Sequence, residues 1–133
     1  MIGIVLVTHG RLADEFLNAL VHVMGKQDAV ATVAIGPDDN MSDRRADVVA
    51  AIAKVEQGDG VIVCTDLYGG TPSNIAISVM EETKAEVVTG VNMPLLIKLA
   101  EVRENLPLPA AVAAAREAGQ KYINVASALI AAK

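Results

Sequence analysis

Short apolar runs alternate with amphipathic stretches along the whole chain, and this alternation restricts the possible folds more than any other feature. Residues 2–7 form an almost continuous apolar run, which is typical of a strand buried on both faces. Similar runs occupy residues 29–35, 60–65 and 86–91, each followed by apolar residues at helical spacing. This order predicts a doubly wound α/β fold: a four-stranded parallel sheet with helices on both faces, in a single domain over residues 1–133.

Start and stop residues bound the helices between these strands. Gly25 fits the end of the first helix. Asn92 fits the N-cap of the helix predicted to end near residue 101. Thr71 and Pro72 have the residue types preferred at the N-cap and at the first helical position. The predicted helices cover residues 12–24, 42–57, 71–82, 92–101 and an Ala-rich stretch ending at Gly119. Residues 122–127 fit either a last short strand or a helix.

Composition and charge exclude several classes of protein. Hydrophobic residues make up 53% of the chain and aromatic residues only 2%, so the core must consist of Ala, Val, Ile and Leu. The net charge of −5 does not attract nucleic acid, and few rings are available to stack on bases. The single Cys64 excludes a disulfide framework and favours a reducing compartment. Without a membrane-spanning run or a signal peptide, we expect a cytoplasmic protein that touches membranes at most peripherally.

Polar residues without a packing role gather where the predicted strands end. In an open α/β sheet, ligands bind beyond the carboxyl ends of the strands, near the point where the strand order reverses. The first strand ends at His9, the third at Asp66 and the fourth near Asn92. We therefore expect these three residues at one edge of the sheet.

His9 and Asp66 form the candidate catalytic pair. An imidazole is a nucleophile near neutral pH, and a carboxylate on one ring nitrogen leaves the other nitrogen free to attack. Gly10 allows close approach of another group to the ring. The alternative is a solvated loop histidine and an aspartate that merely initiates a turn. Thr71 and Ser73 have capping explanations, so a hydrolytic triad is disfavoured.

A glycine pair before the third helix is the second candidate feature. Gly69 and Gly70 can expose backbone N–H groups to an anion, and the Thr71 hydroxyl can add a donor. A phosphoryl group on His9 would need such donors for its oxygens. The alternative is a tight strand-to-helix turn with an ordinary cap.

Other polar residues give weaker signals. His22 lies within the first predicted helix, and the pair Arg44 and Arg45 is interpreted as a solvated helix face rather than a docking patch. No P-loop or G-x-G-x-x-G motif is present, so ordinary nucleotide-binding folds receive no support. The sequence has no metal-ligand pattern and implies no cofactor.

Three segments at the predicted strand ends form a recognisable set. Residues 7–10 read V-T-H-G, residues 66–74 read D-L-Y-G-G-T-P-S-N, and residues 90–94 read G-V-N-M-P. In this order and at this spacing they resemble the mannose-family enzyme IIA domain of the bacterial phosphotransferase system. The resemblance extends to about residue 127.

The resemblance implies a phosphoryl carrier. His9 would take a phosphoryl group from the phosphohistidine of HPr and pass it to a IIB protein, and Asp66 would orient the ring. The residues expected to bind phosphate are Gly10, Gly69, Gly70 and Thr71, and those expected to line the site are Tyr68, Pro72 and Asn92. The family fold adds a strand exchanged across a homodimer, which would be residues 122–127.

Two residues depart from the family pattern, and the phosphoryl acceptor stays open. Tyr68 replaces an expected Trp and Ser73 an expected large apolar residue, and both are predicted to border the docking surface. No IIB domain or Ala/Pro linker follows in this sequence. The hypotheses are a relay for sugar uptake, a stand-alone regulator controlled by phosphorylation of His9, and a small-molecule-binding domain in which His9 contacts ligand.

Overall fold

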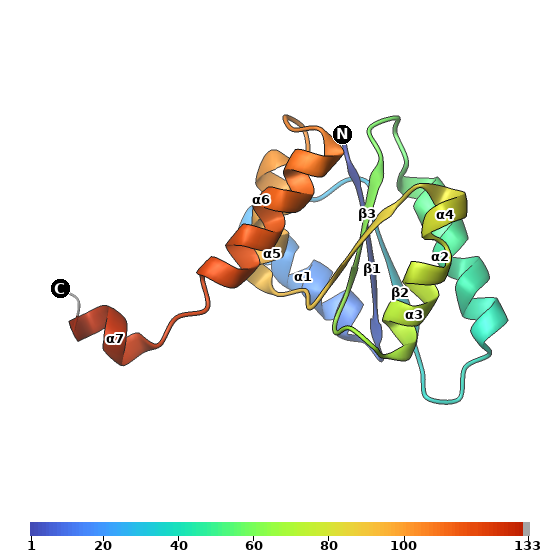
Figure 1. Cartoon of the computed structure of the whole chain (residues 1–133), viewed down its shortest axis with the longest axis horizontal. Helices are drawn as coiled ribbons and strands as arrows, with labels where there is room; N and C mark the ends of the chain where they lie inside the picture. The colour runs from blue at the N-terminus through green and yellow to red at the C-terminus, as the bar shows by residue number, and fades with distance from the viewer. Residues whose placement is uncertain (132–133) are drawn as a thin grey trace.

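One parallel sheet forms the centre of the computed structural model, which describes residues 1–131 (Figure 1). Its strands are β1 (Gly3–His9), β2 (Val30–Ile35), β3 (Val61–Thr65) and β4 (Glu86–Thr89). They run in the order β2-β1-β3-β4, and every neighbouring pair is parallel. The predicted four-stranded parallel sheet is confirmed, and the strand order reverses between β1 and β3.

Helices cover both faces of the sheet, as the alternation predicts (Figure 1). One face carries α1 (Leu12–Met24), α5 (Met93–Val102) and α6 (Leu108–Lys121). The other carries α2 (Met41–Val55), α3 (Thr71–Ser78) and α4 (Met80–Thr83). A last helix, α7 (Ala126–Ala131), lies away from the body of the molecule (Figure 1).

The alternation of side chains along β1 decides which helix layer each residue faces. Val5 and Val7 are buried with residues of α2 and α3, whereas Ile4 and Leu6 are buried with residues of α1, α5 and α6. Successive strand residues point to opposite faces of a sheet. At the end of the strand, His9 continues the series of Val5 and Val7. Its side chain is therefore placed toward the layer of α2 and α3.

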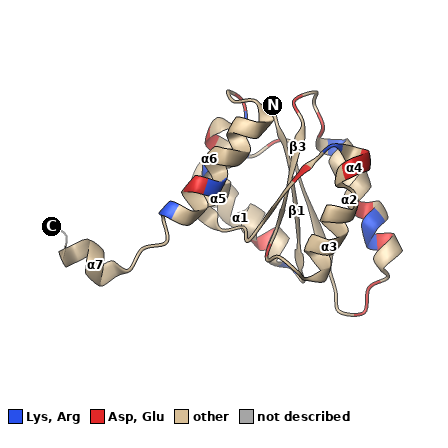
Figure 2. Ribbon diagram, viewed as in Figure 1, with Lys and Arg blue, Asp and Glu red and all other residues tan. Residues whose placement is uncertain are grey.

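Most charged residues lie on the helices and loops, and Glu86 opens the edge strand β4 (Figure 2). The strands β1 and β3 contain no Lys, Arg, Asp or Glu. The Cys64 thiol in β3 is wholly buried, and burial raises its pKa to about 12, so it stays protonated and unreactive at neutral pH. Within residues 1–131, no helix has the length and apolar character needed to cross a membrane.

The helix predicted over residues 71–82 is divided into two helices in the structure: α3 ends at Ser78, and α4 begins at Met80. Arg45 of α2 reaches across to this break. Its Nε donates to Ser78 Oγ and its Nη2 to the Ser78 carbonyl, each at 3.2 Å, and Nη2 also pairs with Glu82. Arg45 therefore has a partner on another helix, which the interpretation as a solvated face missed.

Residues 122–127, which fit either a strand or a helix in the sequence, form no strand in this single chain. Tyr122 ends α6, residues 123–125 have no regular structure, and α7 follows. A strand needs a neighbour for its N–H and C=O groups, and this segment projects away from the sheet (Figure 1). Ile123 and Val125 are 75% and 69% exposed as a result.

Arg103 ties the end of α5 to the amino ends of two strands. It is only 3% exposed. Its Nε donates to the Ile2 carbonyl at 3.0 Å, its Nη2 to the Ala29 carbonyl at 2.8 Å, and its Nη1 to Gln27 Oε1 at 3.3 Å. Burial lowers the pKa of this guanidinium from its ordinary value. Removing it would leave buried carbonyl groups with fewer partners.

We expect Arg103→Met to lower the free energy of unfolding by about 2–4 kcal/mol, because hydrogen bonds from a charged group to buried acceptors are lost. Urea denaturation measures the change. The matched control is Lys98→Met on the same helix, whose exposed ion pair with Glu101 should contribute less than about 0.5 kcal/mol. Equal losses in the two variants would contradict the stabilising role of Arg103.

Candidate functional site

Because β1 and β3 are neighbours, their carboxyl ends bring His9 and Asp66 together. His9 Nδ1 lies 2.8 Å from Asp66 Oδ2, and the backbone N–H of His9 donates to the same oxygen at 3.1 Å. The other carboxylate oxygen accepts the N–H of Leu67 at 3.2 Å. The Asp66 side chain is 10% exposed and that of His9 is 48% exposed. The carboxylate is therefore fixed within the turn, while the ring keeps an open side.

This hydrogen-bond pattern assigns the tautomer of His9. A carboxylate accepts hydrogen bonds, so the hydrogen of the neutral ring belongs on Nδ1 and the lone pair on Nε2. An electrophile that approaches from solvent can then meet an unprotonated nitrogen. The sequence predicts this pair from the strand ends, and its chemical role stays a prediction.

Gly70, rather than Gly10, provides the close approach to the ring. A Cβ on Gly70 would lie 2.7 Å from His9 Cε1 and 3.1 Å from His9 Nε2, so a larger residue would displace the imidazole. A Cβ on Gly10 would meet nothing within 4 Å. The positive φ of 54° explains the glycine at position 10 instead.

Ser73 holds the glycine turn in place. Its Oγ accepts the N–H of Gly69 at 3.0 Å and donates to the carbonyl of Gly70 at 3.1 Å. The residue is completely buried. The prediction that Ser73 borders a docking surface is therefore wrong: a hydroxyl is needed here inside the turn.

The free backbone donors beside His9 are fewer than the glycine content suggests. The Gly10 N–H already donates to the Ile35 carbonyl at 2.9 Å, and that of Gly69 is bonded to the Ser73 hydroxyl. Within residues 1–131, the N–H groups of Gly70 and Thr71 have no partner. Gly70, not the predicted Thr71, is the N-cap of α3, and no side chain caps this helix. Free N–H groups at a helix N-terminus favour an anion.

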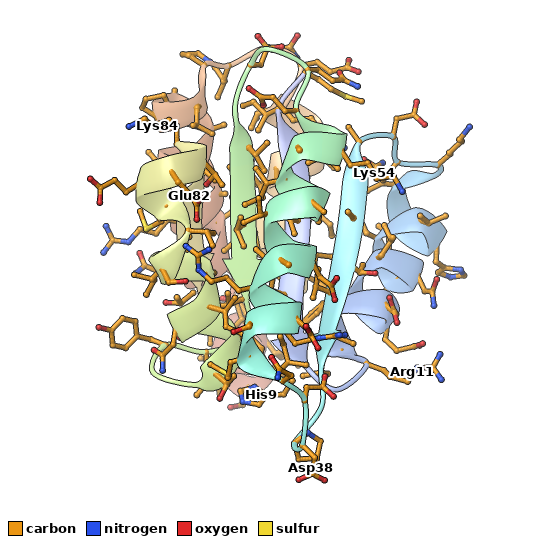
Figure 3. All side chains as sticks on the ribbon, turned by 90° about the vertical axis from the view of Figure 1, so that its right-hand side faces the viewer. His9, Arg11, Asp38, Lys54, Glu82 and Lys84 are labelled. Atoms are coloured by element: carbon orange, nitrogen blue, oxygen red, sulfur yellow. The ribbon has the colours of Figure 1, made fainter. Side chains whose placement is uncertain are left out.

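A cavity of about 210 Å³ opens beside the ring, where α2 and α3 begin. Figure 3 shows His9 at this end of the molecule. The lining residues are His9, Gly10, Ile35, Gly36, Pro37, Asp39, Met41, Arg44 and Thr71. Among them, Arg44 is the one Lys or Arg and Asp39 the one carboxylate. The structure describes no group of three His, Cys, Asp or Glu side chains within residues 1–131 that could hold a metal ion.

Sequence reasoning missed Arg44 because it treated Arg44 and Arg45 as one solvated face. The structure separates them: Arg44 lines the cavity beside His9, and Arg45 contacts the break between α3 and α4. The signal that could have found Arg44 is its position near the start of α2. In a parallel α/β fold, each helix begins at the edge where the strands end.

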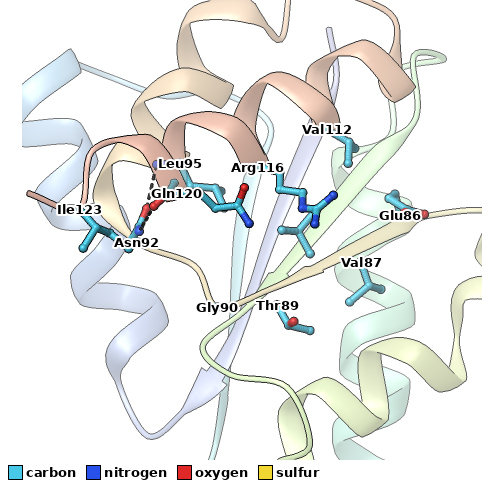
Figure 4. Close-up of a pocket in the computed structure, with 12 residues that line it drawn as sticks. Glu86, Val87, Thr89, Gly90, Asn92, Leu95, Val112, Arg116, Gln120 and Ile123 are labelled. Atoms are coloured by element: carbon cyan, nitrogen blue, oxygen red, sulfur yellow. Dashed lines mark hydrogen bonds between the residues drawn. The ribbon is translucent and has the colours of Figure 1, made fainter.

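Three residues predicted to line the site have different surroundings. Tyr68 projects outward and is 76% exposed, and Pro72 is buried at the start of α3. Asn92 is engaged elsewhere: its Oδ1 accepts the N–H of Leu95 at 3.0 Å and its Nδ2 donates to the Gly119 carbonyl at 2.9 Å (Figure 4). Asn92 therefore caps α5 as predicted and joins it to α6, and it does not line the cavity beside His9.

The sequence matches one family of phosphotransferase-system proteins. The model of the EIIA-man family, described as "PTS system fructose IIA component", covers residues 3–116. The chain belongs to this family. The resemblance to mannose-family enzyme IIA domains that three strand-end segments indicated is thereby confirmed.

Individual relatives agree in sequence and in fold. The mannose-specific EIIAB component of Escherichia coli is 31% identical over 129 residues, which are 96% of this chain but only 40% of that protein. The chain thus spans less than half of that relative. A crystal structure of the phosphotransferase system component EIIA from Streptococcus agalactiae superimposes with a TM-score of 0.88 at 25% identity, covering 96% of this chain and 99% of that one. The mannose/sorbose-specific IIA subunit from Enterococcus faecalis gives a TM-score of 0.83 at 27% identity, covering 93% of each chain.

We expect Gly70→Ala to displace the His9 imidazole while the fold remains intact, because its Cβ would overlap the ring. Long-range ¹⁵N NMR of the imidazole nitrogens measures the change in hydrogen bonding at Nδ1. Asn74→Ala, at an exposed position of the same helix, is the matched control. Unaltered His9 signals in Gly70→Ala would show that the close approach does not constrain the ring.

Proposed function

We propose that this chain is a phosphoryl carrier, in which His9 accepts a phosphoryl group from phosphorylated HPr and passes it to a IIB protein during sugar uptake. The observation that supports this most is the hydrogen bond from His9 Nδ1 to Asp66, which leaves Nε2 open in a member of the EIIA-man family. Such a carrier works in the cytoplasm and reaches a permease only through IIB. The proposal takes residues 1–133 as one IIA unit.

The transfer exchanges one N–P bond for another. The lone pair of His9 Nε2 attacks the phosphorus of the phosphohistidine in HPr. As the new N–P bond forms, the donor's N–P bond breaks and its electron pair stays on the donor imidazole. The hydrogen on His9 Nδ1 remains in place, and Asp66 stabilises the positive charge that the ring gains.

The start of α3 supplies groups for the transferred oxygens. The N–H groups of Gly70 and Thr71, which have no partner among the described residues, belong to a helix N-terminus beside the ring, and Thr71 lines the cavity. Phosphoryl transfer depends mainly on positioning and charge stabilisation, which such groups provide. Because few backbone N–H groups are free, each of them would contribute strongly to binding the phosphoryl oxygens.

We expect the wild-type protein to acquire an acid-labile phosphoryl group when it is incubated with phosphoenolpyruvate, enzyme I and HPr. His9→Ala should abolish labelling. His22→Ala is the matched control, because it removes the second histidine of the chain from an exposed position on α1 and should label normally. Label retained by His9→Ala would refute the site, and an unlabelled wild type with a cognate HPr would refute the function.

The same proposal includes a homodimer in which residues 122–127 pair with a second copy. β4 is an edge strand, so one side of its backbone has no neighbour in the sheet. A cavity of about 480 Å³ lies between β4 and α6, with Ile123 at its border (Figure 4). The exposed Ile123 and Val125 give the segment the apolar, β-branched character of a strand that is completed by a partner.

We expect the full chain to sediment as a dimer at micromolar concentration. A variant truncated after Lys121 should sediment as a monomer with the same sheet, because the exchanged segment contributes little to the core of its own chain. Far-UV circular dichroism checks the fold of the truncated variant. A monomeric full chain would contradict the exchange.

A further inference from the structure

We propose that Arg44 binds the phosphoryl group on His9 and thereby sets how strongly the protein retains it. The proposal rests on the proposed function, because it concerns the phosphorylated form of the same site. It assigns a phosphoryl-binding role to a side chain outside the three strand-end segments on which the family resemblance rests.

Phosphorylation of His9 would gather negative charge in a small space. A phosphoryl group carries a charge of about −1.5 to −2 at neutral pH. Asp66 already occupies the far side of the ring, and Asp39 lines the cavity on the near side. Of the expected backbone donors, those of Gly10 and Gly69 are engaged. The N-terminus of α3 offers only about half a positive charge. A cationic side chain is therefore needed to balance the remaining negative charge of the phosphoryl group.

The position of Arg44 suits this role. It lines the same cavity as His9 and Thr71, and its side chain is 32% exposed, so the guanidinium is partly withdrawn from water. Within residues 1–131, its one charged partner is Asp47, whose Oδ2 lies 3.1 Å from Nη1. The Nε atom is buried and has no hydrogen-bond partner among the described residues. A buried donor without a partner is uncommon in folded proteins and is consistent with a ligand that the free site lacks.

The guanidinium chemistry matches the ligand. Its planar array of N–H groups can bind two phosphoryl oxygens at once, which the single point charge of a lysine cannot do as well. Asp47, which lines a separate cavity along β2 together with Arg44, engages Nη1 and leaves the other donors of Arg44 without a charged partner among the described residues. The neighbouring Arg45 cannot substitute, because its guanidinium is bound to Ser78 and Glu82.

The first experiment measures the equilibrium of phosphoryl exchange with HPr for the wild type and for two Arg44 variants. We expect R44Q to shift the equilibrium about tenfold toward phospho-HPr, and R44K to restore part of the loss. The matched control is K54Q, which removes one positive charge from the same helix. Lys54 lies at the opposite end of the molecule from His9 (Figure 3). Thermal denaturation of each variant separates this effect from unfolding.

A second experiment does not depend on HPr, so failure of the proposed function cannot hide the result. His9 is phosphorylated chemically with phosphoramidate, and ³¹P NMR follows the titration of the phosphoryl group. R44Q should move the midpoint to higher pH, because the dianion loses a cation that stabilises it, whereas K54Q should leave it unchanged. Equal midpoints in wild type and R44Q would overturn the Arg44 proposal even if HPr phosphorylates the wild type. An unlabelled wild type in the HPr assay would instead overturn the carrier function alone.

Discussion

The hydrogen bond between His9 Nδ1 and Asp66 Oδ2 is the interaction on which the account of this site depends. It joins the ends of β1 and β3, the two strands between which the strand order reverses. The same carboxylate oxygen also accepts the backbone N–H of His9, so the turn and the ring are held by one group. The parallel sheet positions the site because it brings the carboxyl ends of these two strands together.

The glycines and the serine around the ring act through space and geometry more than through charge. Gly70 leaves room for the imidazole, and the buried Ser73 hydroxyl keeps the preceding turn closed. These contacts consume donors that would otherwise be available to an anion. A site built in this way has few backbone donors to spare, and this shortage is the reason for the role that we propose for Arg44 in the phosphorylated form.

Much of the fold and part of the site can be predicted from the sequence. The apolar runs and helical spacing suffice for the four parallel strands and the helix layers, since strand and helix periods are local properties. The pairing of His9 with Asp66 follows from the rule for strand ends once β1 and β3 are taken as neighbours. Sequence periodicity cannot show contacts between distant elements. For this reason it missed Arg44 in the cavity, the contact of Arg45 with the α3 break and the engagement of Asn92 with α6. The contacts of Ser73 are local, but periodicity does not show that its side chain turns back into the glycine turn. Residues 122–127 form no strand in the single chain, where no partner strand is present, and the exchange across a dimer stays a prediction.

In the proposed carrier, Asp66 holds Nδ1 of His9, and Nε2 is the atom that carries the phosphoryl group. The most direct test is ¹⁵N and ³¹P NMR of the phosphorylated protein labelled at histidine. We expect a ³¹P–¹⁵N coupling at Nε2 of His9, with a hydrogen still present on Nδ1. A phosphoryl group on Nδ1, or on any residue other than His9, would contradict it.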